Sequence, residues 1–312
     1  MDPHSEPSAS TPRSAVSING ISKRYGRLTA VEDLNLEVAQ GEVFGFLGLN
    51  GAGKTTTIRI LLDLLRPSAG RANVMGRDCQ SEGLEVRSLV GYLPGEMGLY
   101  RDMTGRELLD FLGRLCARPV VESYREELQQ RMELSAVEMK RKLREYSTGM
   151  KRKLGLIQAF QSDPPLLILD EPTEGLDPLM QESFYELLSD VKSRGKTVFM
   201  SSHVLSEVGR VCDRIGLLRK GELVLLSSVE DVRAMAPRRV RVRFDSDVNR
   251  GPGELPAECE LVEIQPRLWS LRVHGPLGWF IEDLSGLPVL DIEIDEPRLE
   301  DVLTKYYREE DR

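Results

Sequence analysis

The sequence predicts an α/β fold with a parallel sheet, and three features of the chain support this assignment. Short apolar runs typical of buried strands alternate with helical segments, which is the pattern of strands joined by crossover helices. A glycine-rich loop follows the apolar run at residues 43–47, and an acidic pair follows a second run at 166–169. Ligands bind at the carboxyl ends of parallel strands, so we expect the loop and the acidic pair to share one edge of the sheet.

Length, charge and cysteine content restrict the class of protein. A chain of 312 residues can form one or two domains, and its net charge of −8 argues against nucleic acid as a partner. The four cysteines are far apart, which favours reduced thiols in a cytoplasmic compartment. No apolar run approaches the ~20 residues that span a bilayer, and the N-terminus lacks a signal-peptide core. We therefore expect a cytosolic protein.

The first part of the chain reads as a tail followed by strands around the glycine-rich loop. Residues 1–14 are rich in Pro, Ser and Ala, and we expect them to be disordered. Alternating apolar residues then predict an antiparallel pair of strands. The helix after the loop should stop near Leu65, because Pro67 cannot continue it. In order, the expected elements are strands at 16–21, 30–38 and 43–47, a helix from Gly53 to about Leu65, a strand near 72–76, a helix near 82–88 and an apolar segment at 89–93.

The rest of the chain divides into a helical insertion, a second set of strands and a C-terminal domain. Residues 104–160 read as mostly helical, because apolar residues recur at three- and four-residue spacing. From about Arg238 the apolar residues alternate with period two, which predicts a small α+β domain over 238–312. The other expected elements are strands at 166–169, 197–200, 215–218, 222–226, 260–264, 268–273 and 289–294, and helices at 178–193, at 276–285 and after Pro297.

The glycine-rich loop GLNGAGKT, residues 48–55, has every fixed position of a phosphate-binding loop. Its glycines allow successive backbone N–H groups to turn around an anion, and the following helix adds its positive N-terminal end. Lys54 is expected to contact the β- and γ-phosphates of ATP, and the Thr55 hydroxyl to bind Mg²⁺. The candidate nucleotide-binding residues of this loop are Gly48, Asn50, Gly51, Ala52, Gly53, Lys54, Thr55 and Thr56.

The acidic pair in LLILDEP, residues 166–172, supplies the remaining chemistry. Asp170 is a second candidate ligand for Mg²⁺, and Glu171 is the candidate general base that polarises water. His203 follows the next predicted strand and reaches the same edge of the sheet. An ordinary strand end followed by a solvated turn would show the same carboxylates, so their assignment depends on the phosphate-binding loop.

The sequence YSTGMKRKL, residues 146–154, is similar to the signature sequence of ATP-binding cassette ATPases, the motor subunits of ABC transporters. Ser147 and Gly149 would open a helix whose amides face the γ-phosphate of ATP held by another subunit. The alternative is that Ser147 only caps a helix, and that the basic residues 140–144 and 151–153 form a solvated face. The resemblance covers about residues 15–230. It implies a P-loop NTPase of ABC type with N-terminal antiparallel strands, a helical signature subdomain at about 95–160 and an ATPase domain ending near residue 235.

The resemblance also implies roles for residues whose local sequence has a simpler explanation. His203 matches the switch histidine that contacts the γ-phosphate, and the segment 174–177 matches the loop that crosses the dimer interface. Asp177 followed by Pro178 is equally a helix N-cap and first helical residue. Tyr25 matches the aromatic residue that stacks on adenine, although an exposed tyrosine in a turn would look the same.

For partners, the resemblance implies ATP and Mg²⁺, a second ATPase subunit in a homodimer, and a transmembrane permease that contacts residues between Gly95 and Arg118. Such a subunit lies at the inner face of the cell membrane. Thr148 and Met150 in the signature, and the C-terminal PRLEDVLTKYY, resemble the drug- and antibiotic-export branch of ABC-2 type.

One position departs from the family, and two other functions stay open. After residues 91–94 the family commonly has a glutamine that senses Mg²⁺ and the attacking water, whereas this chain has Gly95 and then Glu96. The alternatives to an exporter subunit are a soluble ABC ATPase that acts on DNA or ribosomes, and a regulatory or immunity protein that binds ATP without useful turnover. Glu171 argues against the second alternative, and Gly95 keeps it open.

Overall fold

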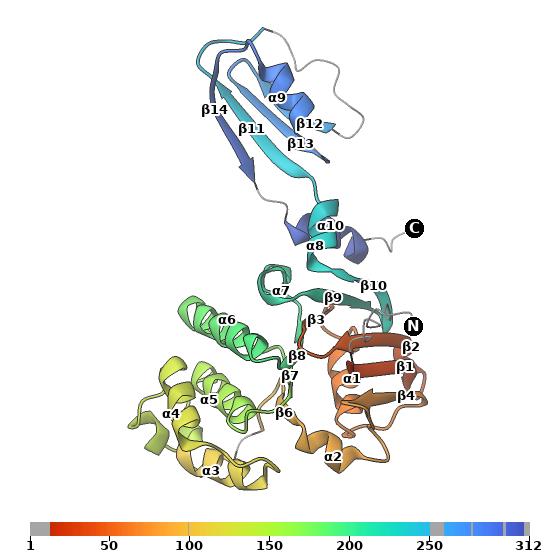
Figure 1. The fold of residues 1–312 in the computed structure, drawn as a ribbon, viewed down its shortest axis with the longest axis vertical. Helices are drawn as coiled ribbons and strands as arrows, with labels where there is room; N and C mark the ends of the chain where they lie inside the picture. Colours follow the sequence, from red (N-terminus) through yellow and green to blue (C-terminus); the bar gives the residue numbers. More distant parts are fainter. Residues whose placement is uncertain (1–12, 99, 250–258, 276, 296–297, 309–312) are drawn as a thin grey trace, which may run out of the picture. The chain divides into compact units, whose positions relative to one another are not determined.

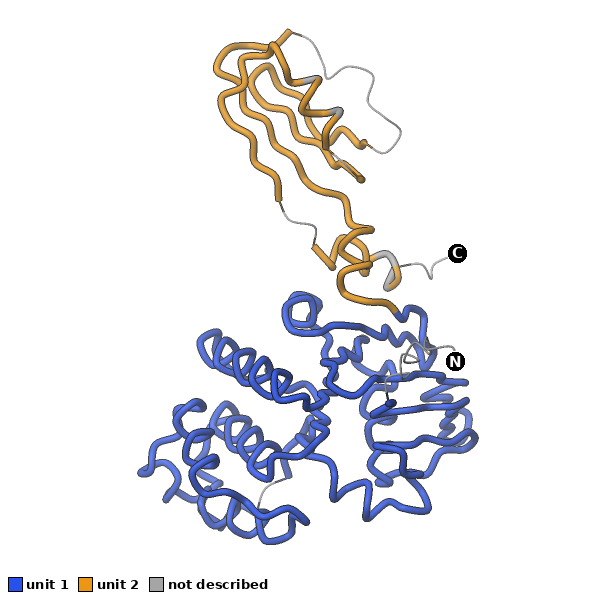
Figure 2. The backbone as a smooth tube through the Cα atoms, viewed as in Figure 1, with its two compact units in different colours: residues 1–226 blue, residues 227–312 orange. Residues whose placement is uncertain are grey.

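The computed structural model describes residues 13–98, 100–249, 259–275, 277–295 and 298–308. The chain forms two compact units, residues 1–226 and 227–312 (Figure 2). This division precedes the change of sequence pattern at Arg238, because helix α8 (Val229–Met235) packs against α10 (Leu299–Arg308) within the second unit. Most of the expected disordered tail lies outside the described residues, but Ser14 already begins the first strand.

A six-stranded sheet forms the centre of the first unit (Figure 1). β3 runs parallel to both β8 and β9, and β7 runs parallel to both β6 and β8. β3, β7 and β8 are buried along their whole length, as their apolar runs predict, and the polar residues that end β7 and β8 are buried with them. Across the sheet the strands are β10 (Glu222–Ser228), β9 (Arg214–Arg219), β3 (Val43–Leu47), β8 (Thr197–Ser202), β7 (Leu166–Asp170) and β6 (Val90–Leu93).

A second, four-stranded antiparallel sheet lies in the same unit. The predicted antiparallel pair is confirmed as its first two strands, and the strand expected near 72–76 joins this sheet and not the central one. Apolar residues of both sheets and of helix α1 form one core, which includes Leu36, Ile58 and Phe199. In order the strands are β2 (Leu28–Ala39), β1 (Ser14–Tyr25), β4 (Ala69–Val74) and β5 (Arg77–Asp78).

Helix α1 (Lys54–Leu61) is shorter than the sequence suggested, since it was expected to reach about Leu65. Asp63 has a φ of +53°, which ends the helical hydrogen-bond ladder. The amides of Leu64 and Leu65 turn back to the carbonyl of Arg59, at 2.8 and 3.2 Å. A left-handed residue, and not Pro67, therefore ends the helix.

The helical insertion is confirmed (Figure 1). A reciprocal capping box between Thr104 and Glu107 begins its first helix. Two single 3₁₀ turns, at Glu138–Lys140 and Leu143–Glu145, connect the second helix to the third. The three helices are α3 (Gly105–Leu115), α4 (Glu122–Arg131) and α5 (Thr148–Phe160).

Three further helices connect strands of the first unit: α2 (Gly83–Ser88), α6 (Pro178–Ser193) and α7 (Leu205–Val211). The sequence predicted α2 and α6 but not α7, which has only seven residues. α7 packs on β3, where a Cβ at Gly45 would lie 2.5 Å from a methyl group of Val208. Tertiary contact therefore stabilises this short helix, which its local sequence does not specify.

The second unit has its own sheet and core. Val240, Val242 and Phe244 point to one face of β11 (Arg238–Phe244), where they pack with Trp269 and with Phe280 of α9 (Gly278–Leu284). The sequence did not predict α8, and Pro297 lies outside the described residues. In the order of the sheet the strands are β12 (Cys259–Gln265), β13 (Leu268–Val273), β11 (Arg238–Phe244) and β14 (Val289–Asp295). Within the described part of the chain, no helix is both long and apolar enough to cross a membrane.

Candidate nucleotide-binding site

The phosphate-loop candidate begins at the carboxyl end of β3 and has a conformation that only glycine adopts easily. Gly51 has a φ of +82° and Gly53 a φ of +111°. A Cβ at Gly53 would lie 2.4 Å from the carbonyl oxygen of Ala30 in β2, so the neighbouring strand also excludes a side chain there. Asn50 and Gly51 are exposed at the tip of the loop, while Ala52 is buried.

Lys54 turns its side chain back into this loop and is only 6% exposed. Its ammonium group donates to the carbonyl of Gly48 at 2.5 Å and to that of Leu49 at 3.4 Å. The same Nζ lies 3.1 Å from Oε1 of Glu171. That oxygen has no aligned hydrogen-bond donor, so the contact is an ion pair without hydrogen-bond geometry. A buried ammonium with these partners forms a fixed positive site at the mouth of the loop.

Asp170 ends β7 and is held by hydroxyl groups on both of its oxygens. Thr55 donates to Oδ2 at 2.9 Å, and Ser201 donates to Oδ1 at 2.5 Å. The Ser201 oxygen also accepts the backbone N–H of Glu171 at 3.0 Å, so it orients both members of the acidic pair. Sequence reasoning missed Ser201. Its only signal was a polar residue at the buried end of β8, where the parallel register pairs it with Asp170.

Glu171 has a left-handed backbone, with a φ of +50°, which is uncommon for a residue with a Cβ. The carboxylate of Glu171 faces the side chains of Lys54 and His203. Oε1 lies near Lys54, and Oε2 lies 2.8 Å from Nδ1 of His203. The structure thus brings the phosphate loop, the acidic pair and His203 together at one edge of the sheet, where the sequence placed them.

The residues at Thr55 and Asp170 fit magnesium. A threonine hydroxyl and a carboxylate supply hard oxygen ligands, and Mg²⁺ commonly takes one or two such protein ligands and completes its shell with phosphate and water. The described residues contain no cluster of three or more His, Cys, Asp or Glu side chains that could hold a metal. The donor set therefore suits a cation bound together with a phosphate ligand more than one held by protein alone.

Ser147 and Gly149 lie apart from this cluster. Ser147 is the N-cap of α5 and accepts the N–H of Met150 at 3.2 Å. Residues 147–149 at the start of α5 form the signature turn, which touches the segment after β7. A Cβ at Gly149 would lie 2.9 Å from the carbonyl oxygen of Gly175 in that segment. Among the described contacts, none joins Ser147 or Gly149 to Lys54 or Thr55.

Asp177 and Tyr25 also lie outside the cluster. Asp177 caps α6, because its side chain accepts the N–H of Met180 at 3.0 Å and Pro178 is the first helical residue. Tyr25 is 46% exposed at the end of β1, with the Nζ of Lys23 5.2 Å from the centre of its ring. The helix-cap interpretation of Asp177 is therefore confirmed, whereas Tyr25 is exposed but ends a strand instead of lying in a turn. The roles that the resemblance implies for both residues stay predictions.

The position of the family's glutamine lies directly beside the acidic pair. A Cβ at Gly95 would lie 3.2 Å from Oδ2 of Asp170, while the Glu96 side chain is exposed. The alternative interpretation of residues 151–153 as a solvated basic face is wrong for Arg152, which is 6% exposed. Arg152 donates to the carbonyls of Pro94 and Gly95 at 2.9 and 2.8 Å, because the loop after β6 covers that side of α5.

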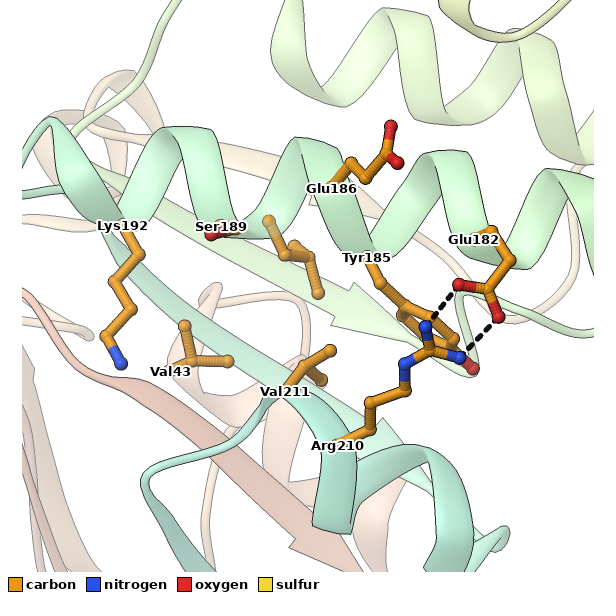
Figure 3. Close-up of a pocket in the computed structure, with 9 residues that line it drawn as sticks. Val43, Glu182, Tyr185, Glu186, Ser189, Lys192, Arg210 and Val211 are labelled. Carbon is orange, nitrogen blue, oxygen red and sulfur yellow. Dashed lines mark hydrogen bonds and ion pairs between the residues drawn. The ribbon is translucent and has the colours of Figure 1, made fainter.

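A groove of about 380 Å³ lies elsewhere, between α6 and α7, at the start of β3 (Figure 3). Arg210 forms a bidentate ion pair with Glu182 there, and its guanidinium lies 4.9 Å from the ring centre of Tyr185. Val43 lines the groove at the end of β3 opposite to the phosphate loop. None of the candidate site residues lines it.

Comparison with known proteins identifies the family. The profile of the ABC transporter family matches residues 31–174. The chain is 32% identical to the bacitracin transport ATP-binding protein BcrA of Bacillus licheniformis, over 91% of this chain and 94% of that protein. It is 36% identical to the daunorubicin resistance ATP-binding protein DrrA3 of Streptomyces coeruleorubidus, over 92% of this chain and 94% of that protein. The chain belongs to the ABC transporter family.

Within the family, this ABC ATPase is similar to ATP-binding subunits of the drug- and antibiotic-export branch, as its signature and C-terminus suggested. It covers 62% of the length of an ABC transporter ATP-binding protein of Nostoc sp., to which it is 39% identical over 66% of the chain. A solved dimeric ATP-binding cassette, in a post-hydrolysis state bound to ADP and Pi, matches it with a TM-score of 0.63. That match has 23% identity and covers 69% of this chain and 98% of the other, which confirms the P-loop fold of ABC type.

Proposed function

We propose that this ABC ATPase hydrolyses MgATP as the motor subunit of an exporter, and that two copies enclose the nucleotide. The observation that carries this proposal is the separation of the candidate residues. The phosphate loop, Asp170, Glu171 and His203 converge within one chain, whereas Ser147 and Gly149 have no described contact with them. A complete site therefore needs the signature turn of a second copy.

Within one chain, each residue has a role that its contacts support. The loop amides and Lys54 bind the β- and γ-phosphates, and Thr55 and Asp170 would hold Mg²⁺, which would neutralise charge on these phosphates. Glu171 accepts a proton from the attacking water, and His203 orients Glu171 through the 2.8 Å contact while facing the γ-phosphate. When the nucleotide binds, its phosphates replace the carbonyls of Gly48 and Leu49 as the acceptors of the Lys54 ammonium.

The second copy supplies the capped N-terminus of α5. Its first amides, together with Ser147, favour a negative γ-phosphate. The solved cassette that shares this fold is a dimer bound to ADP and Pi, and this supports the same arrangement here. Asp177 and the segment before it would then lie along the dimer interface, and Tyr25 would stack on adenine.

The exporter part of the proposal needs a permease that spans the membrane. The predicted contact segment between Gly95 and Arg118 exposes Tyr100, Phe111 and Leu115, with the rings of Tyr100 and Phe111 5.8 Å apart. Exposed large apolar side chains that gather in one segment are typical of a protein contact. We place the ATPase at the inner face of the membrane, attached through this segment.

Glu171→Gln tests the shared site. The amide keeps the size of the side chain but cannot accept the proton, so we expect hydrolysis to fall by ~10²- to 10⁴-fold. ATP should then persist and trap a dimer in size-exclusion chromatography. Glu186→Gln, which changes an exposed carboxylate on α6, should hydrolyse ATP at the parental rate. If Glu171→Gln hydrolyses ATP at the parental rate, Glu171 is not the base. If this variant stays monomeric in saturating ATP, the two copies do not share a site.

A further inference from the structure

One face of α5 carries Gly149, Arg152 and Gly155, which are three residues apart and therefore lie in a row along the helix. Each of the two glycines touches a different loop. A Cβ at Gly149 would lie 2.9 Å from the carbonyl oxygen of Gly175, and one at Gly155 would lie 2.4 Å from the sulfur of Met97. The absence of side chains at both positions lets two loops approach the helix on either side of Arg152.

Arg152 joins these two loops. Its guanidinium donates to the carbonyls of Pro94 and Gly95, in the loop after β6, at 2.9 and 2.8 Å. Its Nε donates to the carbonyl of Glu174, in the segment after β7, at 3.2 Å, and its Nη2 lies 3.6 Å from the Glu174 carboxylate. The planar guanidinium carries donors in fixed directions, which allows one side chain to hold both backbones.

Arg152 is buried, so losing these hydrogen bonds would cost free energy. Arg152 is only 6% exposed, and burial lowers the pKa of its guanidinium, which remains charged at any physiological pH. A buried cation needs its acceptors, and three backbone carbonyls satisfy it here. If one of the two loops moves, Arg152 must move with it or lose hydrogen bonds that water cannot readily replace.

Both loops also contact residues of the proposed site. Gly95 lies against Asp170, with the position of a Cβ 3.2 Å from Oδ2. Glu174 precedes Gly175, which touches the signature turn at Gly149. Arg152 itself lies on the helix that Ser147 caps.

We propose that Arg152 is a positioning residue that couples the permease-facing loop after β6 to the signature end of α5 and to the segment after β7. A displacement at Pro94 and Gly95 is passed through Arg152 to α5, and so to the placement of Ser147 and Gly149 against the ATP of the second subunit. This inference rests on the proposed function and adds a route by which the permease contact segment and dimer closure affect each other.

The test uses Arg152→Met in the full chain that also carries Glu171→Gln, so that ATP is not consumed. Two quantities are measured: the affinity of the monomer for a fluorescent ATP analogue, and the ATP-dependent dimerisation constant from analytical ultracentrifugation. Arg152 does not touch the phosphate loop, so nucleotide affinity should stay within about twofold, while dimerisation weakens by about tenfold or more. A merely structural role would leave the dimerisation constant of the folded protein unchanged.

Arg125→Met is the matched control, because Arg125 is also buried in the helical insertion but pairs with Asp110 and Glu122. It should lower the midpoint of unfolding and leave dimerisation as in the Glu171→Gln parent.

If Arg152→Met dimerises with the same constant as the Glu171→Gln parent, the inference is overturned. If Arg152→Met does not fold, Arg152→Lys decides, since an ammonium cannot reach all three carbonyls, and parental dimerisation would again overturn it. A Glu171→Gln parent that stays monomeric with ATP would instead contradict the proposed function.

Discussion

Asp170 and Glu171 are adjacent carboxylates, yet their surroundings suit different tasks. Asp170 is 1% exposed, and hydroxyl groups of Thr55 and Ser201 fix both of its oxygens in the orientation of a metal ligand. Glu171 has a positive φ, and its carboxylate faces Lys54 and His203. The two adjacent carboxylates therefore have different partners, which suit Asp170 to a cation and Glu171 to the role of base that we propose for it.

Gly95 lies so close to Asp170 that a single added methyl group should disturb the carboxylate. In Gly95→Ala the new methyl group would lie 3.2 Å from Oδ2 of Asp170, and Asp170 cannot retreat because two hydroxyls hold it. We expect the displaced carboxylate to slow steady-state hydrolysis by about 10- to 100-fold and to raise the Mg²⁺ concentration required.

Gly98→Ala is the control for Gly95→Ala, because a Cβ at Gly98 has no atom within 4 Å. It should hydrolyse ATP at the parental rate. Unchanged Mg²⁺ dependence in Gly95→Ala would show that the loop after β6 does not restrict Asp170.

At the scale of single elements, α7 is attached to the site through a buried carboxylate. Glu207 accepts hydrogen bonds from Thr173 at 2.7 Å and from Ser202 at 3.2 Å. Burial raises the pKa of the Glu207 carboxyl, although these two hydrogen bonds oppose the shift. The charge of Glu171 also raises it, and that of His203 lowers it. The short helix thus carries a glutamate that keeps its proton to higher pH than a solvated glutamate does.

This shift predicts a pH dependence of stability. A folded-state pKa above the unfolded value means that the folded protein holds the proton more tightly, so stability is lost as pH rises from about 4.3 through the folded pKa. Glu207→Gln removes this titration and keeps an oxygen acceptor for Thr173 and Ser202. Across that window, urea unfolding should show the variant gaining stability relative to the parent as pH increases.

The exposed variant Glu186→Gln should follow the parent at every pH in the same series. Parallel curves for Glu207→Gln and the parent would mean that Glu207 does not titrate differently in the folded protein.

At the scale of the whole molecule, the chain has two units with separate cores, and both tryptophans, Trp269 and Trp279, belong to the second. Tryptophan fluorescence therefore follows the second unit, while far-UV circular dichroism follows both. Bound nucleotide stabilises the unit that holds it, by about 2.7 kcal/mol at a hundred times Kd. In Glu171→Gln, MgATP should shift the circular dichroism transition in urea to higher concentration more than the fluorescence transition.

Lys54→Ala, introduced into the same background, should abolish the shift, because the loop then lacks the ammonium that we propose binds the phosphates. Equal shifts of the two transitions would show that the two units unfold as one. A shift that persists without Lys54 would place the nucleotide elsewhere.

The sequence alone determined the order of strands and helices around the phosphate loop, because continuous apolar runs and glycine positions are local properties. It also placed Lys54, Thr55, Asp170, Glu171 and His203 at one edge, since parallel strands bring their carboxyl ends together. The family and the P-loop fold followed from these motifs.

Only the tertiary structure decided contacts between residues far apart in the chain. Ser201 reaches Asp170 through the register of β7 and β8, and α7 forms because β3 leaves room at Gly45. Local sequence left a solvated basic face open for Arg152, but the loop after β6 covers this side chain. Burial depends on which segment packs against a helix, and periodicity within the helix does not contain that information.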